Sequence, residues 1–149
     1  MVLKKLFSAI LSVALALTFP GLAAAQEAKA EPSFALELNG LEDTDDGRCG
    51  LLYVVTNKSD IPLDRAAFEM AIFDGSGAVT GLLTFNFGEL IANKVLVKKF
   101  YLPETSCGSI SRIIVNTLVS CTRADTGEEA EFCMTSLTAS SRTDIDFSI

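Results

Sequence analysis

Four carboxylates stand close together in the stretch LEDTDDGR, and they form the group of side chains best suited to chemistry: Glu42, Asp43, Asp45 and Asp46. Clustered carboxylate oxygens on a flexible loop are ligands that Ca²⁺ prefers. The spacing departs from that of an EF-hand loop, because Asp46, Thr44 and Glu42 occupy the alternating positions before Gly47 and no bidentate glutamate follows. We therefore expect a solvated acidic loop, with a calcium-dependent binding module as the alternative.

A second pair of carboxylates, Asp144 and Asp146, stands two residues apart near the end of the sequence. On a strand the two side chains share a face, and paired carboxylates are the acid and base of many glycoside hydrolases. The sequence contains no histidine, the side chain best suited to proton transfer near neutral pH. We expect no catalytic residue and no cofactor, and a carboxylate hydrolase of envelope polymers is a further alternative.

Cysteines are the other reactive side chains, and there are four: Cys49, Cys107, Cys121 and Cys133. No Cys-x-x-Cys pair occurs, so a zinc knuckle or a thioredoxin-type redox motif has no support. If residues 125–128 form a hairpin turn, Cys121 and Cys133 face each other across a ladder. If the start of the second strand lies beside the end of the fifth, Cys49 lies near Cys107. Of three connectivities, we expect Cys49–Cys107 and Cys121–Cys133.

The elements that position these residues read as strands. The segment Cys49–Asn57, CGLLYVVTN, is apolar on both faces and predicts a central strand. Before it, FALELNG alternates apolar and polar residues and ends at Asn39-Gly40, and the turn Asp74–Gly77 predicts a hairpin between two further strands. The run KVLVKKFYLP at residues 94–103 predicts another strand, which Pro103 ends. Residues 109–121 predict one strand or a pair, and residues 142–149 predict an edge strand with a charged face.

Seven or eight short strands separated by turns are typical of an all-β sandwich, which we place at residues 33–149. Residues 26–32 are small and polar, and we expect them to be flexible. Residues 1–25 have the three parts of a signal peptide: a charged start at Lys4-Lys5, an apolar core and the small residues Ala23–Ala25. We expect cleavage after Ala25, a periplasmic or secreted product, and no membrane insertion after cleavage.

Charge limits the partners. The net charge of the full chain is −7, and it becomes −9 when Lys4 and Lys5 leave with the signal peptide. Such a surface repels phosphate backbones, and no segment gathers the basic residues into a patch, so we expect no nucleic-acid partner.

The order of four segments carries a resemblance: LLYVVTN, FEMAIFDGSGAV, FNFGEL and KKFYLPETSCGSISRIIVN. Together they resemble the Ig-like or fibronectin-like β-sandwich modules of exported bacterial proteins. The cysteine pattern and the FALELN opening are similar to those of a family of small, uncharacterised periplasmic proteins. The resemblance covers about residues 33–146, and it implies an Ig-like sandwich and an exported location without any catalytic residue. One departure is Ala92-Asn93, which stands where the modules usually have Pro-Gly.

A complete scaffold without activating side chains favours a non-catalytic module that binds a protein partner in the cell envelope. We expect the partner to add a strand at an exposed edge, first of all at residues 142–149.

Overall fold

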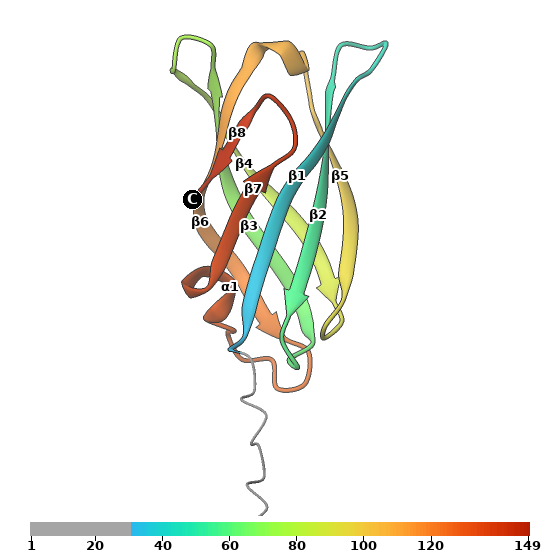
Figure 1. Cartoon of the computed structure of the whole chain (residues 1–149), viewed down its shortest axis with the longest axis vertical. Helices are drawn as coiled ribbons and strands as arrows, with labels where there is room; N and C mark the ends of the chain where they lie inside the picture. The colour runs from blue at the N-terminus through green and yellow to red at the C-terminus, as the bar shows by residue number, and fades with distance from the viewer. Residues whose placement is uncertain (1–30) are drawn as a thin grey trace, which may run out of the picture.

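The computed structural model describes residues 31–149, so the predicted signal peptide and most of the predicted flexible segment lie outside the described residues. Eight strands form two four-stranded sheets, which confirms the all-β sandwich. The strands are β1 (Ser33–Asp43), β2 (Cys49–Lys58), β3 (Leu63–Asp74), β4 (Val79–Leu90), β5 (Val95–Leu102), β6 (Ile110–Arg123), β7 (Leu137–Ser141) and β8 (Asp146–Ser148). One sheet has the order β5-β2-β1-β7 and the other the order β4-β3-β6-β8 (Figure 1).

The core lies between the sheets because alternate residues of each strand point inward. Phe34, Leu36 and Leu38 of β1 are buried, as are Leu51, Tyr53 and Val55 of β2. An aromatic cluster spans the two layers, and its members are Phe34, Tyr53, Phe68, Phe85, Phe87, Phe100 and Phe147. The prediction that β2 is a central strand is confirmed, since β2 pairs with β1 on one side and with β5 on the other.

The predicted turn Asp74–Gly77 joins β3 and β4 in an antiparallel hairpin. The Asp74 carboxylate accepts hydrogen bonds from the backbone N–H of Ser76 at 2.8 Å and of Ala78 at 3.0 Å. Gly77 has a φ of 84°, a conformation that glycine adopts without strain. This local chemistry determines where β4 begins.

Two predicted boundaries are wrong, and one open alternative is decided. β1 does not end at Asn39-Gly40, because a register shift between Leu38 and Gly40 absorbs the break and pairing continues to Asp43. Residues 110–123 form one long strand, so the single strand is the correct alternative of the two left open for residues 109–121. The predicted edge strand 142–149 is reduced to the three residues of β8, because residues 142–145 bend across from one sheet to the other.

Both predicted disulfides, Cys49–Cys107 and Cys121–Cys133, are present. Cys49 is paired in register with Leu102 at the end of β5, as expected for the first bridge. The second bridge does not cross a ladder. After a single bridge between Thr122 and Glu129, the chain enters the short helix α1 (Phe132–Thr135), and this helix carries Cys133 to Cys121. Four residues are too few to show a helical period in the sequence.

Candidate functional site

The four clustered carboxylates do not converge on one point. Glu42 and Asp43 lie on β1 instead of on a loop, and successive strand residues point to opposite faces. Glu42 forms an ion pair with Lys99 on β5. Asp46 forms an ion pair with Arg48 at 2.9 Å, and the hydrogen bonds from Arg48 and then from Thr44 hold the pKa of Asp46 below its ordinary value. These cations occupy carboxylate oxygens of Glu42 and Asp46, two of the four acidic residues that a calcium site would use.

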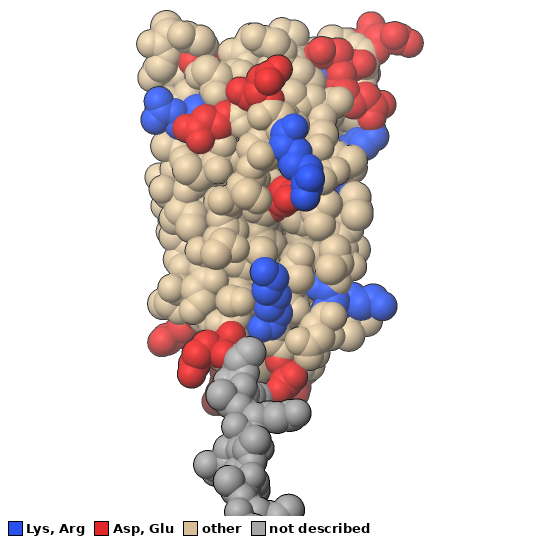
Figure 2. All heavy atoms as spheres, viewed as in Figure 1, with Lys and Arg blue, Asp and Glu red and all other residues tan. Residues whose placement is uncertain are grey.

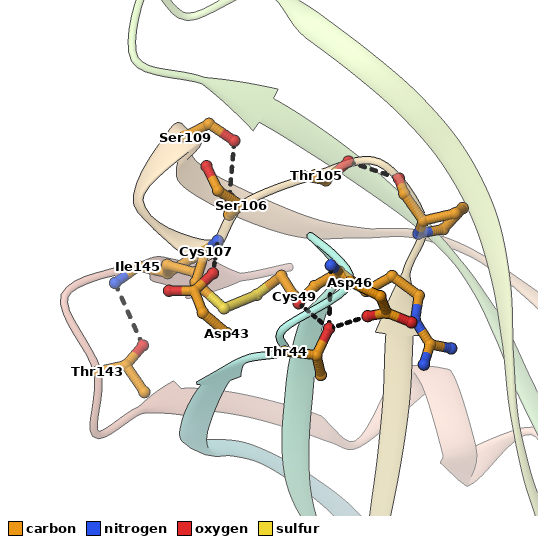
Figure 3. The surroundings of a disulfide bond; sticks show 12 residues. Asp43, Thr44, Asp46, Cys49, Thr105, Ser106, Cys107, Ser109, Thr143 and Ile145 are labelled. Carbon is orange, nitrogen blue, oxygen red and sulfur yellow. Dashed lines mark hydrogen bonds and ion pairs between the residues drawn. A yellow bond between two sulfur atoms is a disulfide. The ribbon is translucent and has the colours of Figure 1, made fainter.

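Asp43 supports the first disulfide (Figure 3). Its carboxylate accepts a hydrogen bond of 2.8 Å from the backbone N–H of Cys107, which lies at the start of the 3₁₀ turn η1 (Cys107–Ser109). Asp43 and Asp144 also line one hollow of about 410 Å³ beside this disulfide. The structure therefore brings together one carboxylate from each of the two groups that the sequence singled out.

The predicted acid/base pair is separated. Asp144 lies in the bend before β8, while Asp146 lies on β8 and forms an ion pair of 3.7 Å with Arg112 of β6. Within residues 31–149, no three side chains of the metal-binding types are grouped so that they could hold an ion. On the face of the molecule in Figure 2, the carboxylates gather near the two ends, and basic and uncharged side chains lie between them.

The strand edges offer a second kind of site, because an edge strand presents unpaired backbone N–H and C=O groups. The two sheets have four edges: β4, β5, β7 and β8. β7 has five residues and β8 has three, and short edges give a partner little to pair with. β5 carries Lys98 and Lys99, and lysines on an edge discourage further pairing. Three of the four edges are therefore protected, and the part of β6 beyond its three-residue pairing with β8 is interrupted by register shifts.

β4 has none of these protections. It has twelve residues and contains neither lysine nor proline. Its pairing with β3 is regular from Gly81 to Asn86, with register shifts on either side. Leu82 on the outer face is 57% exposed, and Leu83 on the inner face is 36% exposed. Residues Gly81–Asn86, which we call the β4 edge, are therefore a regular and partly apolar strand with one free side.

The β4 edge lies beside a gap between the two sheets. The loop 91–94 connects β4 to β5, but the two strands belong to different sheets and do not pair. Phe85 of β4 stacks on Phe100 of β5 with the ring centroids 4.5 Å apart, and this stack closes the middle of the gap. Toward the start of β4 a hollow of about 180 Å³ remains, which we call the edge pocket; it is lined by Ile72, Thr80, Gly81, Leu83, Leu102, Pro103 and Thr105.

Lys98 lies on the other side of this aromatic stack. It is paired in register with the buried Tyr53, so its side chain starts on the inner face of β5. Lys98 is half-buried, and no carboxylate among residues 31–149 forms an ion pair with it. Lys98 therefore brings a cation to the gap without a described carboxylate to pair with it, while its stem covers the inner face of β5.

Sequence reasoning identified the strand β4 but did not identify it as an open edge. Part of the signal is present in the sequence. Residues 79–90 contain no lysine and no proline, and Leu82 and Leu83 are adjacent. Which strand is last in a sheet depends on pairing between distant segments, and that pairing is not visible in a local pattern.

Comparison with known proteins adds a likeness at the level of the fold. No family model matches the chain, and no curated protein matches it. Among solved structures, IrmA from Escherichia coli superposes with a TM-score of 0.55, over 73% of this chain and 92% of IrmA, at 7% sequence identity. The likeness is one of fold alone. It is consistent with a small bacterial β-sandwich protein. Within residues 31–149 there is also no helix long and apolar enough to cross a membrane.

Proposed function

We propose that this protein is a non-catalytic binding module that captures a protein partner by adding one of the partner's strands to the β4 edge. The observation that carries the proposal is the contrast between the edges: β7 and β8 are short, β5 carries lysines, and β4 is long, regular and free of lysine and proline. Strand addition uses backbone hydrogen bonds for affinity and side-chain pockets for specificity. This replaces our expectation of strand addition at residues 142–149.

The same proposal includes an exported, Ig-like module that works in the periplasm or outside the cell. Its support is the pair of disulfides, since disulfides persist in oxidising compartments, together with the signal-peptide pattern of residues 1–25. No observation favours the calcium-dependent module or the hydrolase over binding, because Glu42, Asp46 and Asp146 each form an ion pair.

The test is a pull-down from envelope extract with three forms of the purified protein: wild type, Leu83→Lys and Val119→Lys. Leu83→Lys places an inward-pointing charge on the β4 edge, the device that already protects β5. Val119 is also exposed, but it lies on β6 beyond the three residues that pair with β8, in a stretch with register shifts on its β3 side, so Val119→Lys is the control for the other unpaired stretch of this sheet.

We expect one partner to bind wild type and Val119→Lys and to be lost with Leu83→Lys. Hydrogen exchange of the wild-type complex should then show new protection of those backbone amides of residues 81–86 that point away from β3. Equal capture by all three forms, or a complex without this protection, would contradict strand addition at β4.

A further inference from the structure

Resting on the proposed function, we infer that the partner strand is recognised by an apolar anchor residue and by a carboxylate four or six positions from it on the same face. The observations behind this are the edge pocket, the Phe85–Phe100 stack and Lys98, which pairs with no carboxylate among residues 31–149, and the three follow one another along the gap beside the β4 edge.

The anchor follows from register. Gly81, Leu83 and Phe85 pair with Ile72, Met70 and Phe68, whose side chains are buried, so all three positions of β4 face inward. A strand added beside β4 places the residue opposite Gly81 on this same inward side. Gly81 contributes no side chain, and the edge pocket opens there with a volume of about 180 Å³. Cavities of about 150 Å³ hold a benzene-sized group, so the pocket accommodates one leucine-like side chain.

The carboxylate follows from charge. Side chains on one face of a strand repeat every two residues, about 7 Å apart, so Lys98 lies one such step from Phe100. Phe100 contacts both Phe85 and Phe87 of β4, with ring centroids 4.5 Å and 5.2 Å apart. The partner residue opposite Phe85 or Phe87 therefore comes closest to Lys98. These positions are four and six residues from the one opposite Gly81, and they share its face.

Lys98 differs from the basic residues that form ion pairs on this acidic molecule. The chain has 19 acidic and 12 basic residues, and the ion pairs that the structure describes use Arg48, Lys99, Arg112, Arg123 and Arg142. Lys98 is not among these five cations. It lies on the inner face of an edge strand, and none of the carboxylates in these ion pairs forms an ion pair with it. A carboxylate from a partner strand supplies the missing charge and adds electrostatic selectivity to the apolar anchor.

The experiment uses the purified, oxidised protein and a synthetic threonine-rich peptide of about nine residues, long enough to span the β4 edge. The peptide carries one leucine and two aspartates, four and six positions away, and the reversed sequence is tested beside it because the strand direction is open. The readouts are amide shifts and hydrogen exchange by NMR. We expect protection of residues 81–86 and shifts at Leu83 and Leu102 with one of the two peptides.

Two protein variants test the chemistry. Gly81→Leu places a leucine side chain of the protein itself in the edge pocket, which Gly81 lines. There is room for it, because a Cβ at Gly81 meets no atom within 4 Å. We expect this substitution to lower the affinity for the peptide about tenfold, which is the effect of losing one buried apolar side chain. Gly75→Leu is the control, since Gly75 has equal space but lies in the β3–β4 turn. A peptide with lysines in place of the aspartates should bind wild type about fivefold more weakly and regain affinity with Lys98→Glu.

Each failure has its own reading. If a peptide protects residues 81–86 equally with and without its leucine and aspartates, the anchor and carboxylate are wrong and strand addition stands. If no peptide protects these amides, while a captured envelope partner does, the inferred recognition is wrong for that partner. If neither protects them, the proposed function fails as well. If raising the protein concentration alone protects them, the occupant is a second copy of this chain, which overturns the inference.

Discussion

Tyr53 has the largest of the fully buried side chains, and its hydroxyl is the feature that packing leaves unexplained. Four aromatic rings surround it edge-on: Phe85, Phe87, Phe100 and Phe147. No hydrogen-bond partner for its Oη is present among residues 31–149. Burial raises the pKa of this phenol well above its ordinary value. The apolar ring stabilises the folded core, whereas the buried hydroxyl destabilises it because it makes no hydrogen bond with residues 31–149.

We therefore expect Tyr53→Phe to stabilise the protein by about 1 kcal/mol, because it removes a buried polar group that makes no hydrogen bond. The measurement is the free energy of unfolding in urea. Tyr101→Phe is the control and should change it little, since Tyr101 lies on the surface beside Arg48. A destabilised Tyr53→Phe would mean that the hydroxyl has a partner after all.

Among the elements, the β3–β4 hairpin positions the candidate site. The hydroxyl of Ser76, followed by the backbone N–H groups of Ala78 and Ser76, holds the pKa of Asp74 below its ordinary value. A carboxylate whose pKa is lower in the folded state stabilises that state above the unfolded-state pKa, and this stabilisation disappears as the pH falls through the folded-state pKa. The turn is therefore strongest when Asp74 is ionised.

Asp74→Asn should lower the melting temperature at neutral pH, and the difference from wild type should shrink below about pH 4 and vanish as Asp74 becomes protonated. Thermal unfolding followed by circular dichroism between pH 2 and 7 measures this. Asp64→Asn, an exposed carboxylate at the other end of β3, is the control. A difference that stays constant across this range would show that the charge of Asp74 contributes nothing to the hairpin.

The same elements show how far the sequence leads. Alternation and turn chemistry predict β2 and the β3–β4 hairpin correctly, because both depend on neighbouring residues. β7 pairs with β1, and β8 with β6, in parallel, and these pairings join segments about one hundred and about thirty residues apart along the chain. The sequence points to the acidic residues, but the expectation that all four lie on one loop is wrong. Pairing continues past the register shift near Gly40, so Glu42 and Asp43 are strand residues. The open edge at β4 follows from this long-range pairing and not from its own sequence.

At the scale of the molecule, the disulfides fasten two of the segments that cross between the sheets. Cys107 lies on the crossing from β5 to β6, and Cys49 ties it to β2. Cys133 lies on the crossing from β6 to β7, and Cys121 ties it to β6. The first bridge joins residues 58 apart in sequence, and the second joins residues 12 apart. The cross-links therefore differ mainly in how much of the unfolded chain they restrict.

The chain-entropy model predicts that the longer loop contributes more, about 4 kcal/mol against about 3 kcal/mol for the shorter one. We expect the pair Cys49→Ala/Cys107→Ala to be less stable than the pair Cys121→Ala/Cys133→Ala, as measured by urea unfolding. All four cysteines are buried, so the cavities left by the substitutions are similar and largely cancel in the comparison. If the second pair costs more, the bridge to α1 acts mainly by holding the native crossing in place. In that case the stability of the sandwich depends on how β7 is delivered to the sheet beside β1, and less on the entropy of the unfolded chain.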